Sequence, residues 1–167
     1  MINGIVAVGK NFEIGKKNGL LFKLKEDMKV FTGKTKHNIV AMGENTLLSF
    51  PGSKPLKDRL NIVLCPREHD YEGCICIHDF DTFVKYITLL SKEYEVWIIG
   101  GGMLYKSMLP YYDEVVVNKV DAEDKEATVF FPNLDEDPNF ELYMKCQEVE
   151  DNGYKTQLCF YKRKAVK

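Results

Sequence analysis

The stretch VWIIGGGMLY, residues 96 to 105, holds the feature from which the fold can be interpreted. Val96 to Ile99 have the composition of a buried strand, and three glycines then remove every side chain where the next element begins. Glycine at such a junction lets another group approach the backbone closely. We therefore expect a strand, a glycine turn and a helix here, with another group lying against the turn.

The composition predicts a single domain over residues 1 to 167. The chain is 45% hydrophobic and 29% charged, and a chain of this length buries roughly 70% of its unfolded surface. The net charge of -2 and the pI near 6.0 provide no basic patch for nucleic acid, and no apolar run reaches the ~20 residues that span a membrane. The opening MINGIVAV lacks the basic region and cleavage site of a signal peptide, so we expect a cytoplasmic protein.

The five cysteines form a poor disulfide framework, because their number is odd and their spacing is not clustered. Cys65, Cys74, Cys76 and Cys159 lie in strand-like sequence. Cys74 and Cys76 could be read as metal ligands, but no second Cys or His pair accompanies them. We expect structural thiols and no metal.

Short apolar stretches alternate with amphipathic ones, which predicts an α/β fold with a mixed sheet. The last two strands alternate in polarity, as antiparallel strands do. The predicted strands cover residues 2–8, 38–42, 61–64, 74–77, 96–99, 114–119, 140–147 and 154–161, and the predicted helices cover 25–35, 44–49, 79–91 and 102–109. Two long polar loops, 9–23 and 121–132, are either working parts or surface insertions.

The predicted helix KEDMKVFTGKT, residues 25–35, contains a misplaced carboxylate. Leu24, Met28, Phe31 and Thr35 recur at the spacing of one helical face, and Asp27 shares that face. An ionised carboxylate buried without a partner costs several kcal/mol, so it shifts its pKa, finds donors or binds a ligand. Asp27 is either a satisfied internal residue or a pocket carboxylate.

The stretch IVAMGENT, residues 39–46, repeats the arrangement of strand, glycine and helix start. Such a junction offers free backbone N–H groups and a positive dipole end to an anion. A plain tight turn explains either stretch singly, but two of them beside an acidic residue favour a phosphate-bearing ligand. Neither the G-x-G-x-x-G spacing nor a P-loop lysine is present.

Taken in order, these stretches resemble the dihydrofolate reductase family, in its bacterial chromosomal type. The resemblance covers essentially the whole chain and is carried by MINGIVAVGKNFEIG, LKEDMKVF, IVAMGENT, LKDRLNIVL, VWIIGGGMLY and VDAEDKEATVFFP. It implies a single domain with an eight-stranded, mostly parallel mixed sheet, four flanking helices and an antiparallel C-terminal hairpin. It also implies a monomer that binds dihydrofolate and folate-analogue inhibitors.

The resemblance implies hydride transfer from NADPH to C6 of the pterin in 7,8-dihydrofolate, with a proton reaching N5. Asp27 would hold the pterin and favour that protonation, and Arg59 would bind the α-carboxylate of the glutamate tail. The implied substrate-binding residues are Ile5, Val6, Ala7, Asp27, Met28, Phe31, Phe50, Arg59, Ile99, Tyr105 and Asn118.

The same resemblance implies a cofactor groove and a cis peptide between Gly101 and Gly102. The loop 9–23 would close over the nicotinamide and exclude water. The implied cofactor-binding residues are Ala7, Ile14, Gly15, Gly19, Leu20, Gly43, Glu44, Asn45, Thr46, Leu64, Cys65, Arg67, Ile99, Gly101, Gly102, Met103, Leu104, Tyr105 and Thr128. For the apolar members, core packing is the alternative interpretation.

Several positions depart from the family pattern. At Glu44 and Met103 many members carry basic residues that hold the 2'-phosphate of the cofactor, so we expect a smaller preference for NADPH over NADH unless Arg67 compensates. Asn118 replaces a usual threonine, and Glu126 with Ala127 replaces a common Gly-Asp pair. Leu21 and Phe22 replace a usual proline and tryptophan. With Leu20 and Asn118, these two suggest reduced sensitivity to diaminopyrimidine antifolates.

Two other functions are compatible with this architecture. A pyrimidine reductase of riboflavin synthesis would require neither Asp27 nor Arg59. A folate-binding or nucleotide-binding protein without turnover would be favoured only by Glu44 and Met103.

Overall fold

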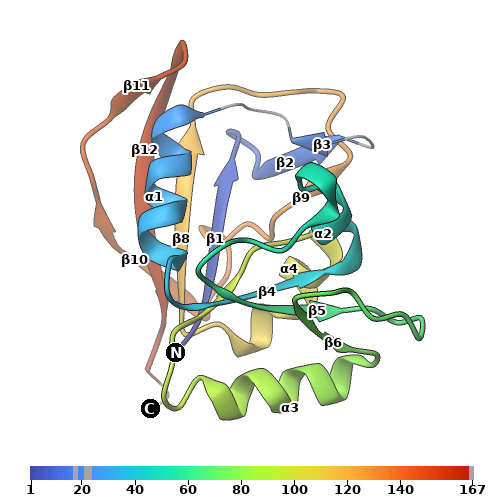
Figure 1. The fold of residues 1–167 in the computed structure, drawn as a ribbon. Coiled ribbons are helices and arrows are strands. Elements are labelled where there is room, and N and C mark those ends of the chain that lie inside the picture. Colours follow the sequence, from blue (N-terminus) through green and yellow to red (C-terminus); the bar gives the residue numbers. More distant parts are fainter. Residues whose placement is uncertain (17–18, 21–23, 166–167) are drawn as a thin grey trace.

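The computed structural model describes residues 1–16, 19–20 and 24–165, and it places one sheet between helices on both faces (Figure 1). The main strands are β1 (Ile2–Val8), β4 (Ile39–Gly43), β5 (Leu60–Leu64), β6 (Cys74–Ile77), β7 (Val96–Ile98), β8 (Glu114–Val120), β10 (Phe140–Lys145), β11 (Val149–Asp151) and β12 (Tyr154–Arg163). Their hydrogen-bonded order is β10-β12-β8-β1-β7-β4-β5-β6, and β11 pairs with β12 beside this path.

The strands from β8 to β6 along this order pair in parallel, whereas β12 is antiparallel to β8, β10 and β11. The predicted eight-stranded, mostly parallel sheet with an antiparallel C-terminal hairpin is therefore confirmed. The ends of the predicted strands and helices differ from those of the structure by at most two residues. Such differences are expected where an element frays at its ends.

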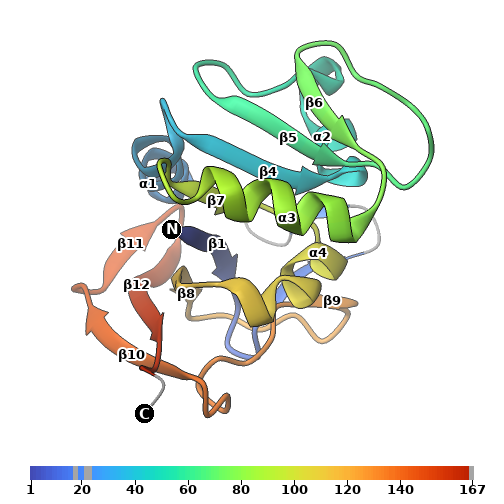
Figure 2. The ribbon, with the colours of Figure 1, turned by 90° about the horizontal axis from the view of Figure 1, so that it is seen from below.

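In the described part of the chain, four α-helices flank the sheet, as predicted. They are α1 (Lys25–Thr35), α2 (Glu44–Ser49), α3 (Phe80–Leu90) and α4 (Gly102–Ser107), with two 3-10 turns, η1 (Pro51–Ser53) and η2 (Leu109–Tyr111). Seen from below, α3 lies nearest the viewer, and α1 and α2 lie behind the strands (Figure 2). No described helix is long and apolar enough to cross a membrane.

Alternation along β1 divides the core between the two faces of the sheet. Val6 and Val8 pack in one cluster with Phe83 of α3. Ile5 points the other way, into a second cluster with Leu47 of α2. Since a strand presents successive side chains to opposite faces, these contacts place α3 and α2 on opposite sides of the sheet.

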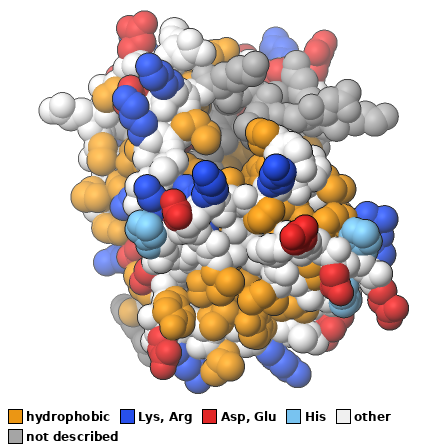
Figure 3. Space-filling view, in the orientation of Figure 1, with side chains coloured by type: hydrophobic (Ala, Val, Ile, Leu, Met, Phe, Trp, Pro, Cys, Tyr) orange, Lys and Arg blue, Asp and Glu red, His pale blue; other side chains and the backbone are white. Residues whose placement is uncertain are grey.

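Part of α3 remains uncovered on its outer side. Leu89 is 62% exposed, although Phe83 and Ile87 of the same helix are fully buried. Figure 3 shows hydrophobic side chains gathered over the lower part of the molecule, where Figure 1 places this helix. Apolar atoms make up a large share of any protein surface, so this patch has no assigned role.

A small second sheet joins the two predicted loops and was not predicted. Its strands β2 (Glu13–Lys16), β3 (Gly19–Leu20) and β9 (Val129–Phe130) run in the order β3-β2-β9. Strands of two to four residues carry too few alternations to show a period in the sequence. Glu13, which is 1% exposed, ties the same two segments together by accepting hydrogen bonds from Asn11 N at 2.7 Å and Asp124 N at 3.2 Å.

Candidate active site

The site lies at the carboxyl edge of the parallel strands, where the chain reverses its direction of winding. The connection through α1 leads from β1 to β4, and the connection through α3 returns the chain to β7, between those two strands. Ligands of open α/β sheets bind in the crevice at such a switch point. Gly43 N donates to Gly100 O at 2.9 Å, so the two predicted glycine junctions lie side by side.

The three glycines that follow β7 have different structural roles. Gly100 has a φ of +136°, which favours glycine, and an added Cβ would lie 3.0 Å from Thr46 Oγ1. An added Cβ on Gly102 would collide with Val129 Cγ1 of β9. One group that approaches the glycine turn is therefore a neighbouring segment of the protein itself.

The predicted position of the cis peptide is wrong by one residue. The cis bond joins Gly100 to Gly101, not Gly101 to Gly102. Gly101 is the N-cap residue of α4 and Gly102 is its first residue, so the peptide bond between them already belongs to the start of the helix.

Asp27 lies in the first turn of α1 and is half-buried. Its Oδ1 accepts a hydrogen bond from Asn118 Nδ2 on β8 at 3.0 Å. Burial is the largest influence on the pKa of the Asp27 carboxyl and raises it. The Asn118 hydrogen bond lowers this pKa and the nearby charge of Asp151 raises it, and the net shift is upward. Asp27 thus has a protein donor and also a raised pKa, a combination suited to a group that gains and loses a proton.

The face of α1 turned to the sheet differs in part from the predicted one. Leu24 and Thr35 are buried and Phe31 is half-buried, as expected, but Met28 is 56% exposed. The buried side of the helix is centred nearer to Asp27 and Phe31, so Met28 falls at its outer edge.

The other predicted substrate-binding residues divide between the two sides of the sheet. Ile5 is buried on the α1 side, with Phe31, Phe50 and Ile99 packed partly against the same cluster. Val6 points into the opposite core, away from these residues. Ala7 is half-buried on β1, opposite Asn118 in the register with β8.

Tyr105 lies beneath the site, with its ring in the core. Its hydroxyl donates to Ile5 O at 2.8 Å. Burial and then the charge of Asp27 raise the pKa of this phenol well above its ordinary value, so it stays neutral.

Arg59 lies at the far end of α1 from Asp27. Its Nε donates to Thr35 Oγ1 at 2.9 Å, its Nη1 donates to Lys57 O at 2.9 Å, and its guanidinium lies 5.9 Å from the centre of the Phe31 ring. Burial lowers the pKa of the guanidinium, which still remains charged at neutral pH. This half-buried fork has the donor geometry that suits a carboxylate.

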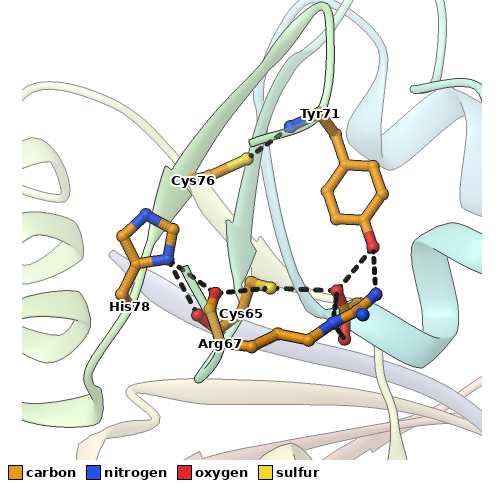
Figure 4. Close-up of polar contacts among 6 residues, drawn as sticks. Cys65, Arg67, Tyr71, Cys76 and His78 are labelled. Atoms are coloured by element: carbon orange, nitrogen blue, oxygen red, sulfur yellow. Dashed lines mark hydrogen bonds and ion pairs between the residues drawn. The ribbon is translucent and has the colours of Figure 1, made fainter. Parts of the chain in front are cut away.

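A polar cluster lies beyond the ends of β4 and β5. Figure 4 labels its members Cys65, Arg67 and Tyr71, and the carboxylate that they contact belongs to Glu44. Arg67 Nε donates to both of its oxygens at 3.0 and 2.9 Å, and Tyr71 Oη and Cys65 Sγ donate to Oε2 at 2.5 and 2.9 Å. Hydrogen bonds from the Cys65 thiol, then Tyr71, then Arg67 lower the pKa of Glu44 to about 2. Glu44 is therefore ionised at neutral pH, and Arg67 is paired with it.

His78 supports the loop that carries Arg67 and Tyr71. Its Nδ1 lies 3.0 Å from both Cys65 O and Arg67 O, and its Nε2 lies 3.3 Å from Asp70 Oδ1. The backbone hydrogen bond to Cys65 O leads the influences that raise the pKa of His78. Neither residue can be predicted from the sequence, because no local pattern shows that Tyr71 reaches Glu44 or that His78 reaches the backbone of Cys65 and Arg67.

The remaining cofactor-binding predictions vary in exposure. Asn45, Met103 and Thr128 are exposed, whereas Leu104 is a core residue in the same cluster as Phe83 of α3. The others lie as follows: Ile14, Thr46, Leu64 and Gly101 are half-buried, Gly15 and Cys65 are buried, and Gly19 lies in β3. The side chain of Leu20, and the residues Leu21 and Phe22, lie outside the described part of the chain.

All five cysteines are free thiols.

Comparison with known proteins gives a consistent result. A family model described as "Dihydrofolate reductase" matches residues 1–164. The dihydrofolate reductase of Haemophilus influenzae is 32% identical over 96% of this chain and 97% of its own length, and that of Bacillus subtilis is 30% identical over 98% and 95%. A solved structure of dihydrofolate reductase from Enterococcus faecalis, complexed with NADP(H) and RAB-propyl, matches with a TM-score of 0.85 at 28% identity, covering 99% of this chain and 97% of that one.

Proposed function

Because this chain belongs to the dihydrofolate reductase family, we propose that it reduces 7,8-dihydrofolate to 5,6,7,8-tetrahydrofolate with NADPH. The observation that carries this proposal is Asp27, a half-buried carboxyl with a raised pKa at the carboxyl edge of the sheet. The product would supply one-carbon metabolism and thymidylate synthesis.

The chemistry requires one hydride and one proton. NADPH, when bound, supplies a hydride to C6 of the pterin and leaves as NADP⁺, and N5 takes a proton that comes ultimately from solvent. Asp27 would bind the amidine-like edge of the pterin and favour protonation at N5. Because N5 lies on the far side of the ring, that proton would pass through water.

Other residues would orient the two ligands. Arg59 would pair with the α-carboxylate of the glutamate tail, and Ile5, Phe31, Phe50 and Ile99 would supply apolar contact to the folate. The sheet edge at the two glycine junctions would accept the dinucleotide, with Gly43 and Gly101 allowing it to approach the backbone. The two loops that are joined by the pairing of β2 with β9 would help to exclude water from the bound ligands.

Glu44 bears on the choice of cofactor. The ionised carboxylate of Glu44 accepts a hydrogen bond from a ribose hydroxyl but repels the dianionic 2'-phosphate of NADPH. Arg67, which is paired with Glu44, is a cation that can accommodate that phosphate. We propose that NADPH is still preferred over NADH but by a smaller margin than in relatives with basic residues here. Comparable kcat/KM values with both cofactors would refute this preference.

The first test is dihydrofolate-dependent loss of nicotinamide absorbance, with NADPH and NADH compared across concentration. Turnover favouring NADPH supports the proposal. Cofactor binding without turnover would instead identify a binding protein, and turnover of a pyrimidine substrate alone would identify a reductase of riboflavin synthesis.

The second test replaces the acid. We expect Asp27→Asn to keep the fold and NADPH affinity but to lose most turnover at neutral pH. Glu26→Gln is the matched control, because Glu26 is the exposed neighbour in the same helical turn. Equal turnover in Asp27→Asn and the parent would remove Asp27 from its proposed role.

A further inference from the structure

The helix that carries Asp27 begins without a local cap. Leu24 is its N-cap residue and supplies no side-chain hydrogen bond to the first turn. The N–H groups of Glu26 and Asp27 instead donate to Asp151 Oδ2, at 3.0 and 3.1 Å. Asp151 ends β11, more than a hundred residues further along the chain, and is 2% exposed. In Figure 1, the β11–β12 hairpin lies beside the start of α1.

A carboxylate in this place has an electrostatic effect on its neighbour. The N-terminus of a helix carries a partial positive charge, which favours the ionised form of an acid in the first turn. Asp27 occupies that turn. Asp151 accepts from two of the free N–H groups and adds a negative charge, so it opposes the effect of the helix end on Asp27.

We propose that Asp151 is a positioning residue for the reaction, which fixes the first turn of α1 and, by holding a second negative charge beside the Asp27 carboxyl, extends to higher pH the range over which that carboxyl holds its proton. This inference rests on the proposed function of Asp27.

The groups that face Asp27 come from four elements. Asn118 of β8 donates to Oδ1, and Tyr105 of α4 lies close enough for the charge of Asp27 to act on its phenol, which remains neutral. On α1 itself, the neighbouring Glu26 pairs with Lys29 on the exposed side. Asp151 of β11 is the charged group from another element that acts on Asp27 within the described part of the chain. Asn118 and Asp151 therefore act on the same carboxyl in opposite directions.

The test is Asp151→Asn, which removes the charge and keeps a carbonyl oxygen that can accept from the two N–H groups. We expect the pH at which turnover is half-maximal to move downward. Turnover at neutral pH falls severalfold, while the plateau at acidic pH matches the parent. Glu150→Gln is the matched control, because it removes the same charge from an exposed residue of the same strand and should leave the profile in place.

A readout independent of activity separates this inference from the proposed function. Carbon-detected NMR of labelled aspartate follows the titration of Asp27 directly in the full chain. A downward shift in Asp151→Asn with no change in the pH–rate profile would support the electrostatic role of Asp151 and refute the role of Asp27 in turnover. An unchanged titration in a folded Asp151→Asn protein would overturn the inference.

Discussion

Gly102 provides the sharpest test of how the glycine turn is built. An alanine Cβ at this position would collide with Val129 Cγ1, and Val129 Cβ lies 3.7 Å away. A β-branched side chain has few alternative rotamers, so Val129 moves only at a cost. Overpacking of this kind costs about 1–3 kcal/mol. We expect Gly102→Ala to lower the free energy of unfolding by ~2 kcal/mol, or the melting temperature by roughly 4–8 °C for a chain of this length.

The chain contains a matched control. Gly33 lies inside α1, and no atom of the described residues lies within 4 Å of a Cβ added there. Gly33→Ala should therefore stabilise the protein by about 0.5–1 kcal/mol through helix propensity and the entropy of the unfolded chain. Urea denaturation followed by circular dichroism measures both variants. If Gly102→Ala were as stable as the parent, the steric argument would be wrong.

The companion variant Val129→Ala separates packing from ligand binding. Removal of the Val129 methyl groups leaves room for the methyl group that Gly102→Ala adds. The double variant should therefore lose less stability than the sum of the losses in the two single variants. NADPH titration of the double variant then gives a second answer. Restored affinity would assign Gly102 to packing alone, whereas weak affinity at restored stability would mean that the cofactor also needs the bare backbone.

Three further outcomes follow from the site. Asn118→Val removes the donor to Asp27, so the raised pKa of that carboxyl should rise further, and the alkaline limb of the pH–rate profile should move to higher pH; a shift to lower pH contradicts this. Glu44→Gln removes an ionised group and should increase the kcat/KM ratio of NADPH to NADH severalfold, which parallel assays with the two cofactors check. Asp151→Ala should lower the free energy of unfolding by about 1–2 kcal/mol because two N–H groups lose their cap, and Asp151→Asn should lose less in the same urea titration.

The fold could be predicted from sequence where local pattern and burial agree. The strand at 2–8 and the helices at 25–35 and 44–49 have the predicted ends. Each has hydrophobic periodicity or a glycine junction within its own residues. The antiparallel pairing of the C-terminal hairpin could also be predicted, because the sequence of the last strands alternates in polarity. Met28 was misplaced because a period of 3.6 residues fixes a face only to within one residue on either side.

The electrostatics of the site depend on contacts that no local pattern contains. The sequence indicates Asp27 because its own helix shows an acid among apolar residues, but the pKa of Asp27 also depends on Asn118 and Asp151 from distant strands. The sequence predicts that Glu44 repels a phosphate, yet Arg67, Tyr71 and Cys65 converge on it from beyond the next strand. Sequence shows which side chains are chemically unusual in their own segment, whereas the charge they carry depends on pairings that only the folded sheet brings together. Mutations of those distant partners should therefore alter pH dependence and cofactor choice without changing any residue of the recognised motifs.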